Sequence, residues 1–159
     1  MLKVTEPLDY ILNNPEATIS YIKSLGTIPD DPRFQKIYTE PPYAYLYCRE
    51  ILKNRWPEIE PIILKDHRSS YLYAEDILKT RWPEAEPTIM KNDRSALLYA
   101  YYVIKNRWPE AEKYIKTNPT SACHYTKELI KERWPEAEPT IKKNKSIWQD
   151  YLQIKENKK

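Results

Sequence analysis

The chain has 159 residues, a net charge of +3 and a single glycine, Gly26. Phosphate-binding loops, dinucleotide-binding turns and nucleophile elbows all need several glycines, so these classes of site are excluded. The cysteines and histidines show no zinc-binding spacing, and we expect neither a metal nor a cofactor; they are Cys48, His67, Cys123 and His124. A hydrophobic content of 41% predicts a folded chain.

The first residues predict no signal peptide, because Glu6 and Asp9 interrupt a short apolar stretch. No segment approaches the roughly 18 to 20 apolar residues of a membrane span. The sparse cysteines favour reduced thiols, so we expect a cytoplasmic protein without a membrane partner. Residues 1–42 carry four bases and six acids, whereas residues 95–159 carry thirteen bases and eight acids. An acidic partner and a solvated basic tail explain this gradient equally well.

A 26-residue repeat organises the chain. The string Arg-Trp-Pro-Glu recurs at this spacing, and Tyr and Ile follow the same period from Tyr21 and Ile11; the strings begin at Arg55, Arg81, Arg107 and Arg133. The pattern predicts an all-α solenoid of short helical hairpins as one continuous domain. We expect a divergent N-terminal portion (residues 1–42), four tandem hairpins (43–146) and a C-terminal capping helix (147–159).

Each repeat begins with a longer helix, which we call the long helix. Its N-cap recurs in one column, at Asn14, Asp66, Asn92, Asn118 and Asn144. Proline occupies the first helical position in three repeats, at Pro15, Pro41 and Pro119. In the last repeat, Ser146 with Gln149 offers a competing capping box. The long helices are expected to end just before each Arg-Trp-Pro, near Asn54, Thr80, Asn106 and Glu132.

A second, short helix follows each Trp-Pro. In one repeat, Trp108, Ala111 and Ile115 form an apolar stripe behind Pro109 at the first helical position. Three other repeats carry a second proline inside this helix, at Pro61, Pro87 and Pro139. In those repeats either the helix begins late or its first turn is loose.

The block that contains Arg-Trp-Pro-Glu admits two interpretations. Lysine, arginine and tryptophan together are typical of nucleic-acid binding. However, the cations lie at the end of one helix and the glutamates at the start of the next, where both suit the helix dipoles. We therefore favour a structural ladder of contacts between repeats, formed by Arg55, Trp56, Arg81, Trp82, Arg107, Trp108, Arg133 and Trp134.

Positions that vary between repeats are the better candidates for function. On the long helices, the face opposite the repeated Tyr and Ala is uneven and includes two consecutive tyrosines, which favours protein binding. The candidate binding residues are Leu46, Arg49, Leu72, Glu75, Leu98, Tyr101, Tyr102, His124 and Lys127. The alternative is that these leucines pack on the second helix of an adjacent repeat.

The string from Tyr99 to Glu112 resembles the tandem repeats of tailed-bacteriophage and related viral proteins, and the resemblance covers residues 43–146. It implies a viral origin, a location in the host cytoplasm and no enzymatic activity. The leading hypothesis is a non-catalytic module that binds and inhibits a host protein, such as a defence protein. Two alternatives are nucleic-acid or nucleotide binding and self-assembly into a homo-oligomer.

Overall fold

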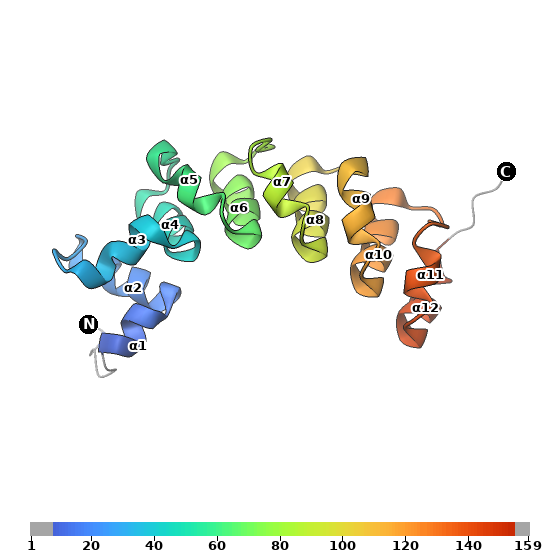
Figure 1. The fold of residues 1–159 in the computed structure, drawn as a ribbon, viewed down its shortest axis with the longest axis horizontal. Helices are drawn as coiled ribbons and strands as arrows, with labels where there is room; N and C mark the ends of the chain where they lie inside the picture. Colours follow the sequence, from blue (N-terminus) through green and yellow to red (C-terminus); the bar gives the residue numbers. More distant parts are fainter. Residues whose placement is uncertain (1–7, 155–159) are drawn as a thin grey trace. The chain divides into compact units, whose positions relative to one another are not determined.

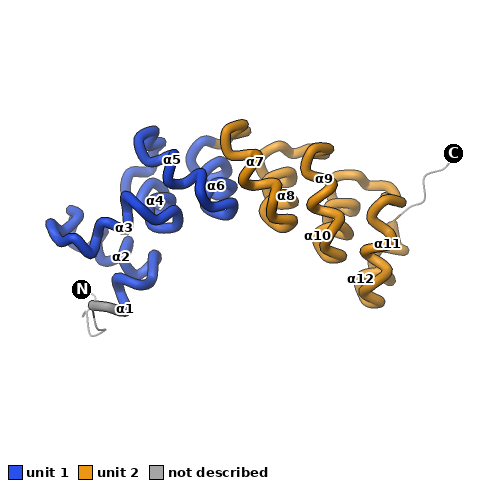
Figure 2. Tube along the Cα trace, viewed as in Figure 1, with its two compact units in different colours: residues 1–78 blue, residues 79–159 orange. Residues whose placement is uncertain are grey.

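The computed structural model describes residues 8–154, and within this range every regular element is a helix (Figure 1). The expected all-α fold class is therefore confirmed. The chain divides into two compact units, residues 1–78 and residues 79–159 (Figure 2).

In the first unit, the long helices pack side by side, because α4 contacts both α2 and α6. Its core contains the fully buried Ile37 and Ile63 and the nearly buried Ile19 and Ile22. The elements are α1 (Leu8–Asn13), α2 (Pro15–Leu25), η1 (Pro32–Gln35), α3 (Lys36–Thr39), α4 (Pro41–Tyr47), η2 (Cys48–Leu52), η3 (Pro57–Ile59), α5 (Glu60–Ile63), α6 (His67–Tyr73) and η4 (Ala74–Leu78).

In the second unit, α10 contacts both α8 and α12, so these three long helices form one layer. The short helices α7, α9 and α11 pack against one side of this layer (Figure 1). Fully buried Ile115 and Tyr125 belong to the core. The elements are α7 (Glu86–Ile89), α8 (Asp93–Tyr99), η5 (Ala100–Ile104), α9 (Pro109–Ile115), α10 (Pro119–Tyr125), η6 (Thr126–Ile130), α11 (Glu138–Ile141) and α12 (Lys145–Tyr151).

The predicted N-caps are confirmed at all five positions, whereas α4 begins after Glu40 without a side-chain cap. For example, Asp66 Oδ2 accepts a hydrogen bond from the Ser69 amide at 2.7 Å. The other caps bond in the same way, at Asn14, Asn92, Asn118 and Asn144. Because Asn144 is the cap, α12 begins at Lys145 and the competing start at Ser146 is wrong.

Four long helices end in a π-helical turn, which no sequence pattern indicated. In η6 the Lys131 amide donates to the carbonyl of Thr126, five residues earlier, at 2.7 Å. Helix α2 instead closes with the Gly26 amide on Ile22, four residues earlier. The left-handed residue after α2, Gly26, comes twelve positions after the N-cap Asn14. The left-handed residue after η6, Lys131, comes thirteen positions after the N-cap Asn118. Each π turn therefore accommodates one extra residue.

The helices end two residues before the expected positions, at Leu52, Leu78, Ile104 and Ile130. A lysine in the left-handed region follows each of them and stops the helix; these are Lys53, Lys79, Lys105 and Lys131, with φ between 51° and 64°. This region usually favours glycine. Lysines thus hold the turn conformation that Gly26, with φ of 73°, holds after α2.

The short helices confirm the effect predicted for the second proline. Helix α9, which has Lys113 in that column, is regular from Pro109 onward. In the other three repeats the α-helix begins one residue before the second proline, at Glu60, Glu86 and Glu138. The late start leaves no helical carbonyl for the proline to block.

Candidate protein-binding face

A hydrogen-bonded cluster, which we call the junction, recurs at each Arg-Trp-Pro-Glu string. The Tyr125 hydroxyl accepts a hydrogen bond from the Trp108 amide at 2.5 Å and donates one to Glu112 Oε1 at 3.1 Å. Glu112 also accepts two hydrogen bonds from Arg107, at 2.9 and 3.1 Å. The same tyrosine bond joins Trp56 to Tyr73, Trp82 to Tyr99 and Trp134 to Tyr151, at 2.9, 2.7 and 2.6 Å.

Burial sets the protonation of the junction. It raises the pKa of Tyr99 and Tyr125, so their hydroxyls stay protonated and can donate to the glutamates. Burial would also raise the pKa of Glu138, but hydrogen bonds from Arg133 and Lys142 outweigh it and lower that pKa. Glu138 is therefore ionised at neutral pH and can hold both cations, at 2.6 Å from Arg133 and 3.3 Å from Lys142.

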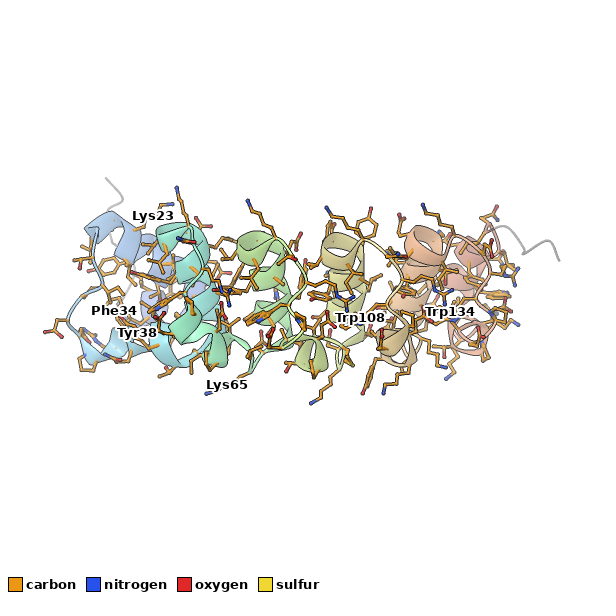
Figure 3. The ribbon with its side chains drawn as sticks, turned by 90° about the horizontal axis from the view of Figure 1, so that it is seen from above. Lys23, Phe34, Tyr38, Lys65, Trp108 and Trp134 are labelled. Carbon is orange, nitrogen blue, oxygen red and sulfur yellow. The ribbon has the colours of Figure 1, made fainter. Side chains whose placement is uncertain are left out.

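Three tryptophans of the ladder are buried, Trp82, Trp108 and Trp134, whereas Trp56 is half-buried. Trp108 and Trp134 lie among the helices of the second unit (Figure 3) and are 2% and 5% exposed. Tyr99 packs on Trp108 with ring centroids 5.1 Å apart, and Tyr125 packs on Trp134 at 5.5 Å. The indoles thus pack on tyrosine rings and the arginines pair with glutamates of the same chain. The left-handed lysines, in contrast, are exposed to solvent.

In the first unit, the candidate face contains one buried member. Leu46 is only 6% exposed, so a partner cannot reach most of it. Burial is what the alternative interpretation predicts for this leucine, and the long helices α2 and α6 flank α4 here. Arg49 is exposed, and Leu72 and Glu75 are half-buried.

A polar cluster anchors Arg49 on this face. Its guanidinium donates to the Tyr45 hydroxyl at 2.8 Å, lies 3.8 Å from Asp76 and sits over the Tyr45 ring at 5.4 Å. The Tyr45 hydroxyl in turn donates to Asp76. Burial raises the pKa of Tyr45, and the hydrogen bond to Asp76 acts in the same direction. The cluster fixes Arg49 between α4 and η4.

Hollows lie between successive long helices of this unit. The first, of about 230 Å³, lies between α2 and α4 and is lined by Glu16, Lys23 and Arg49 among others; Lys23 extends outward from the ribbon (Figure 3). The second, of about 270 Å³, lies between α4 and α6 and includes Arg68 and Leu72. Five of the seven residues that line the first hollow have their equivalent, 26 residues later, in the lining of the second. A furrow thus recurs along the long-helix layer.

Sequence reasoning missed several members of this surface. Glu16 and Lys23 belong to the divergent first repeat, which was not included in the candidate face. They occupy the columns of Pro42 and Arg49 at the 26-residue offset. Extending the column comparison to the first repeat would have found them. The Tyr45–Asp76 bond has no such signal, because it joins different columns of two helices.

In the second unit, the face presents two adjacent aromatic rings. Tyr101 and Tyr102 are 40% and 47% exposed, and their rings meet edge to face at 4.9 Å between centroids. Leu98 is half-buried, and His124 and Lys127 are exposed on the neighbouring long helix. The unit therefore presents an aromatic pair beside basic side chains.

No family model, curated protein or solved structure matches this chain. Among residues 8–154, no three His, Cys, Asp or Glu side chains gather in an arrangement that could hold a metal ion. Within the same residues, no helix has the length and apolar character needed to cross a bilayer.

Proposed function

We propose that this chain is a non-catalytic protein-binding module, built as a continuous solenoid of helical hairpins with a 26-residue repeat. The recurring junctions support the solenoid, because repeat arrays use the same contact between each pair of neighbours. They also separate framework from function. The junction residues are the same in each copy, whereas the exposed columns of the long helices vary between copies.

The exposed pair Tyr101 and Tyr102 is the observation that carries the proposal. In the first unit, the same two columns hold charged side chains, Arg49 with Glu50 and Glu75 with Asp76. Tyrosines supply a large contact area with few rotatable bonds and are enriched among the residues that dominate interface energies. Their hydroxyls also satisfy the polar rim of an interface.

The side chains around the pair indicate the chemistry of the partner. Lys105, Lys127 and His124 lie on the same long-helix layer and are exposed. We propose that the partner offers an apolar pocket for one tyrosine ring, surrounded by acidic side chains that complement these bases. The furrow of the first unit would bind a part of the partner that carries charges of both signs.

A viral origin extends this proposal. The resemblance to tailed-bacteriophage repeat proteins supports a small protein that acts in the host cytoplasm by blocking a host protein. Such an inhibitor needs a binding face and no reactive site. A scaffold of repeated junctions that carries one variable face meets this need.

A capture experiment with matched variants tests the proposed function. The variant Tyr101→Ala/Tyr102→Ala should retain the helical circular dichroism of the parent chain and lose a specific partner from host lysate. The control Tyr10→Ala/Tyr114→Ala also removes two tyrosines, but away from the face, and should retain the partner. Equal capture by both variants would exclude the tyrosine pair as the binding site.

The contacts of the junction bear on nucleic-acid binding by the ladder but not on self-assembly. A nucleic-acid site on the ladder would have to use lysines alone, because Arg107 and Trp108 are engaged in the junction. Self-assembly remains a prediction, and light scattering at high concentration tests it.

A further inference from the structure

Positive charge is concentrated in the second unit. Residues 79–159 carry seventeen bases and eleven acids, whereas residues 1–78 carry nine bases and twelve acids. Much of the excess falls in the three turns that lead from a short helix into the next long helix, at residues 91–94, 116–120 and 142–146. These turns contain six cations and one acid, Asp93. We call this surface the cap-turn edge: Lys91, Arg94, Lys116, Lys142, Lys143 and Lys145.

The three turns are neighbours along one edge of the unit. The Ser121 hydroxyl, in the first turn of α10, donates to the Asp93 carboxylate at the start of α8. The Cys123 thiol faces the carbonyl of Ile147, in the first turn of α12, at 4.0 Å. Contacts of α10 with both α8 and α12 agree with this order. The cations therefore follow one another from turn to turn.

The cations of this edge are largely without partners. Within the described residues, Lys91, Lys116 and Lys143 form no ion pair, and Lys142 pairs with Glu138. Asp93 already accepts the hydrogen bond from Ser121. The edge thus presents its positive charge to solvent, where its attraction for anions is uncompensated.

The junctions of the same unit carry as many cations, but these are balanced by acids. There each Arg-Trp-Pro-Glu string places Arg81, Arg107 and Arg133 on the carboxylates of Glu86, Glu112 and Glu138. The same strings add further exposed acids, Glu84, Glu110, Glu132 and Glu136. The difference between the cap-turn edge and the junctions therefore arises from the acids rather than from the number of bases.

We propose that the cap-turn edge binds the phosphate backbone of a nucleic-acid duplex. Packed helices lie about 8 to 10 Å apart, so the three turns would span roughly 16 to 20 Å. At about 3.4 Å per base pair, this length covers five or six base pairs. A regular array of cations at helical spacing fits the regular phosphate array of a duplex.

The side chains of the edge fit contacts to phosphate rather than readout of bases. Five of the six cations are lysines, which act as point charges without the planar fork of arginine. Single-strand binding also needs exposed rings for base stacking. Trp108 and Trp134 are buried, and the exposed Tyr101 and Tyr102 lie beyond the end of α8, two turns from its cap. Binding should therefore be independent of sequence and separate from the protein-binding face.

The experiment compares two variants with the same change in net charge. The edge variant Lys91→Gln/Lys116→Gln/Lys143→Gln removes one lysine from each cap turn. The control Lys79→Gln/Lys105→Gln/Lys131→Gln removes one exposed lysine from each junction string. Both full-length variants and the parent chain are titrated into fluorescein-labelled duplex DNA of two unrelated sequences, at salt concentrations from about 50 to 200 mM. Vesicles containing phosphatidylserine serve as a second polyanion.

The parent chain should bind both duplexes equally, with an affinity that falls steeply with salt. For the edge variant, the logarithm of the association constant is plotted against the logarithm of the salt concentration. The slope of this plot should be about 2.7 less negative than for the parent chain, which corresponds to three lost phosphate contacts. The control should keep the parent slope. Equal losses in both variants, no duplex binding by the parent chain, or binding to vesicles in preference to DNA would each overturn the proposal.

Discussion

The hydroxyl of Tyr125 accepts a hydrogen bond from the backbone amide of Trp108, seventeen residues earlier, while donating to the Glu112 carboxylate. The tyrosine belongs to a long helix, and the tryptophan and glutamate belong to the preceding junction. One side chain thus satisfies a buried amide and orients a half-buried carboxylate. The bond recurs at four junctions, where it joins each long helix to the string before it.

The substitution Tyr125→Phe tests this bond. It leaves the buried Trp108 amide without an acceptor, which should lower the free energy of unfolding by about 1 to 3 kcal/mol. Urea denaturation followed by circular dichroism measures the change. Tyr101→Phe removes the hydroxyl of an exposed tyrosine and should change stability by less than about 0.5 kcal/mol. Similar losses in the two variants would contradict the role of the junction.

The ion pairs of Glu138 predict a dependence on pH. Because its pKa is lowered in the folded state, the carboxylate stabilises the protein above its unfolded-state pKa, near 4.5. This contribution is lost as the pH falls through the folded-state pKa. The stability difference between the parent chain and Glu138→Gln should therefore shrink between neutral and acidic pH. Glu136→Gln removes a carboxylate at an exposed position that makes no ion pair among the described residues, and is the matched control for the loss of charge.

The left-handed lysines predict an unusual response to glycine. Lys105 has φ of 58°, so Lys105→Gly should relieve backbone strain and raise the free energy of unfolding by about 0.5 to 1 kcal/mol. Lys116, at the end of α9, has φ of −69°. Lys116→Gly should lower the free energy of unfolding by about 0.5 to 1 kcal/mol. At this position there is no backbone strain to relieve, and glycine increases the conformational entropy of the unfolded chain. A stability loss in both variants would contradict the assigned turn.

The late start of three short helices predicts that α9 tolerates a proline in one position. Lys113→Pro should convert its first turn to the form seen around Pro87 and Pro139, at a cost well below the usual 3 kcal/mol or so. Tyr114→Pro, one residue later, should cost about 3 kcal/mol or more, because no repeat adapts to proline in that column. Thermal unfolding of the two variants makes the comparison.

The features that sequence predicted are those controlled by side chains within a few residues. Asn118 caps α10 by bonding amides two and three residues away, so its type and position sufficed. The second prolines were equally informative, because their effect on a helix is local. The 26-residue period also placed Tyr125 and Trp108 in repeating columns, although it could not show that one bonds to the other.

The features that sequence missed depend on backbone geometry or on a neighbouring helix. A π turn before Lys131 leaves no signal in residue type, and lysine is not a typical left-handed residue. A helical wheel placed Leu46 on the open face, because it represents a single helix. The packing of α4 between α2 and α6 buries that leucine. For the same reason, Arg49 was found but its anchor on Tyr45 and Asp76 was not.

Site-specific photocrosslinking tests the central claim most directly, which is that the long-helix face around Tyr101 and Tyr102 binds a protein. Benzoylphenylalanine is placed at position 101 or 102, and in matched chains at position 10 or 114, before irradiation in host lysate. Positions 101 and 102 should give a covalent adduct with the same single protein, and positions 10 and 114 should give none. Absence of an adduct from the face, or equal labelling from all four positions, would contradict the account.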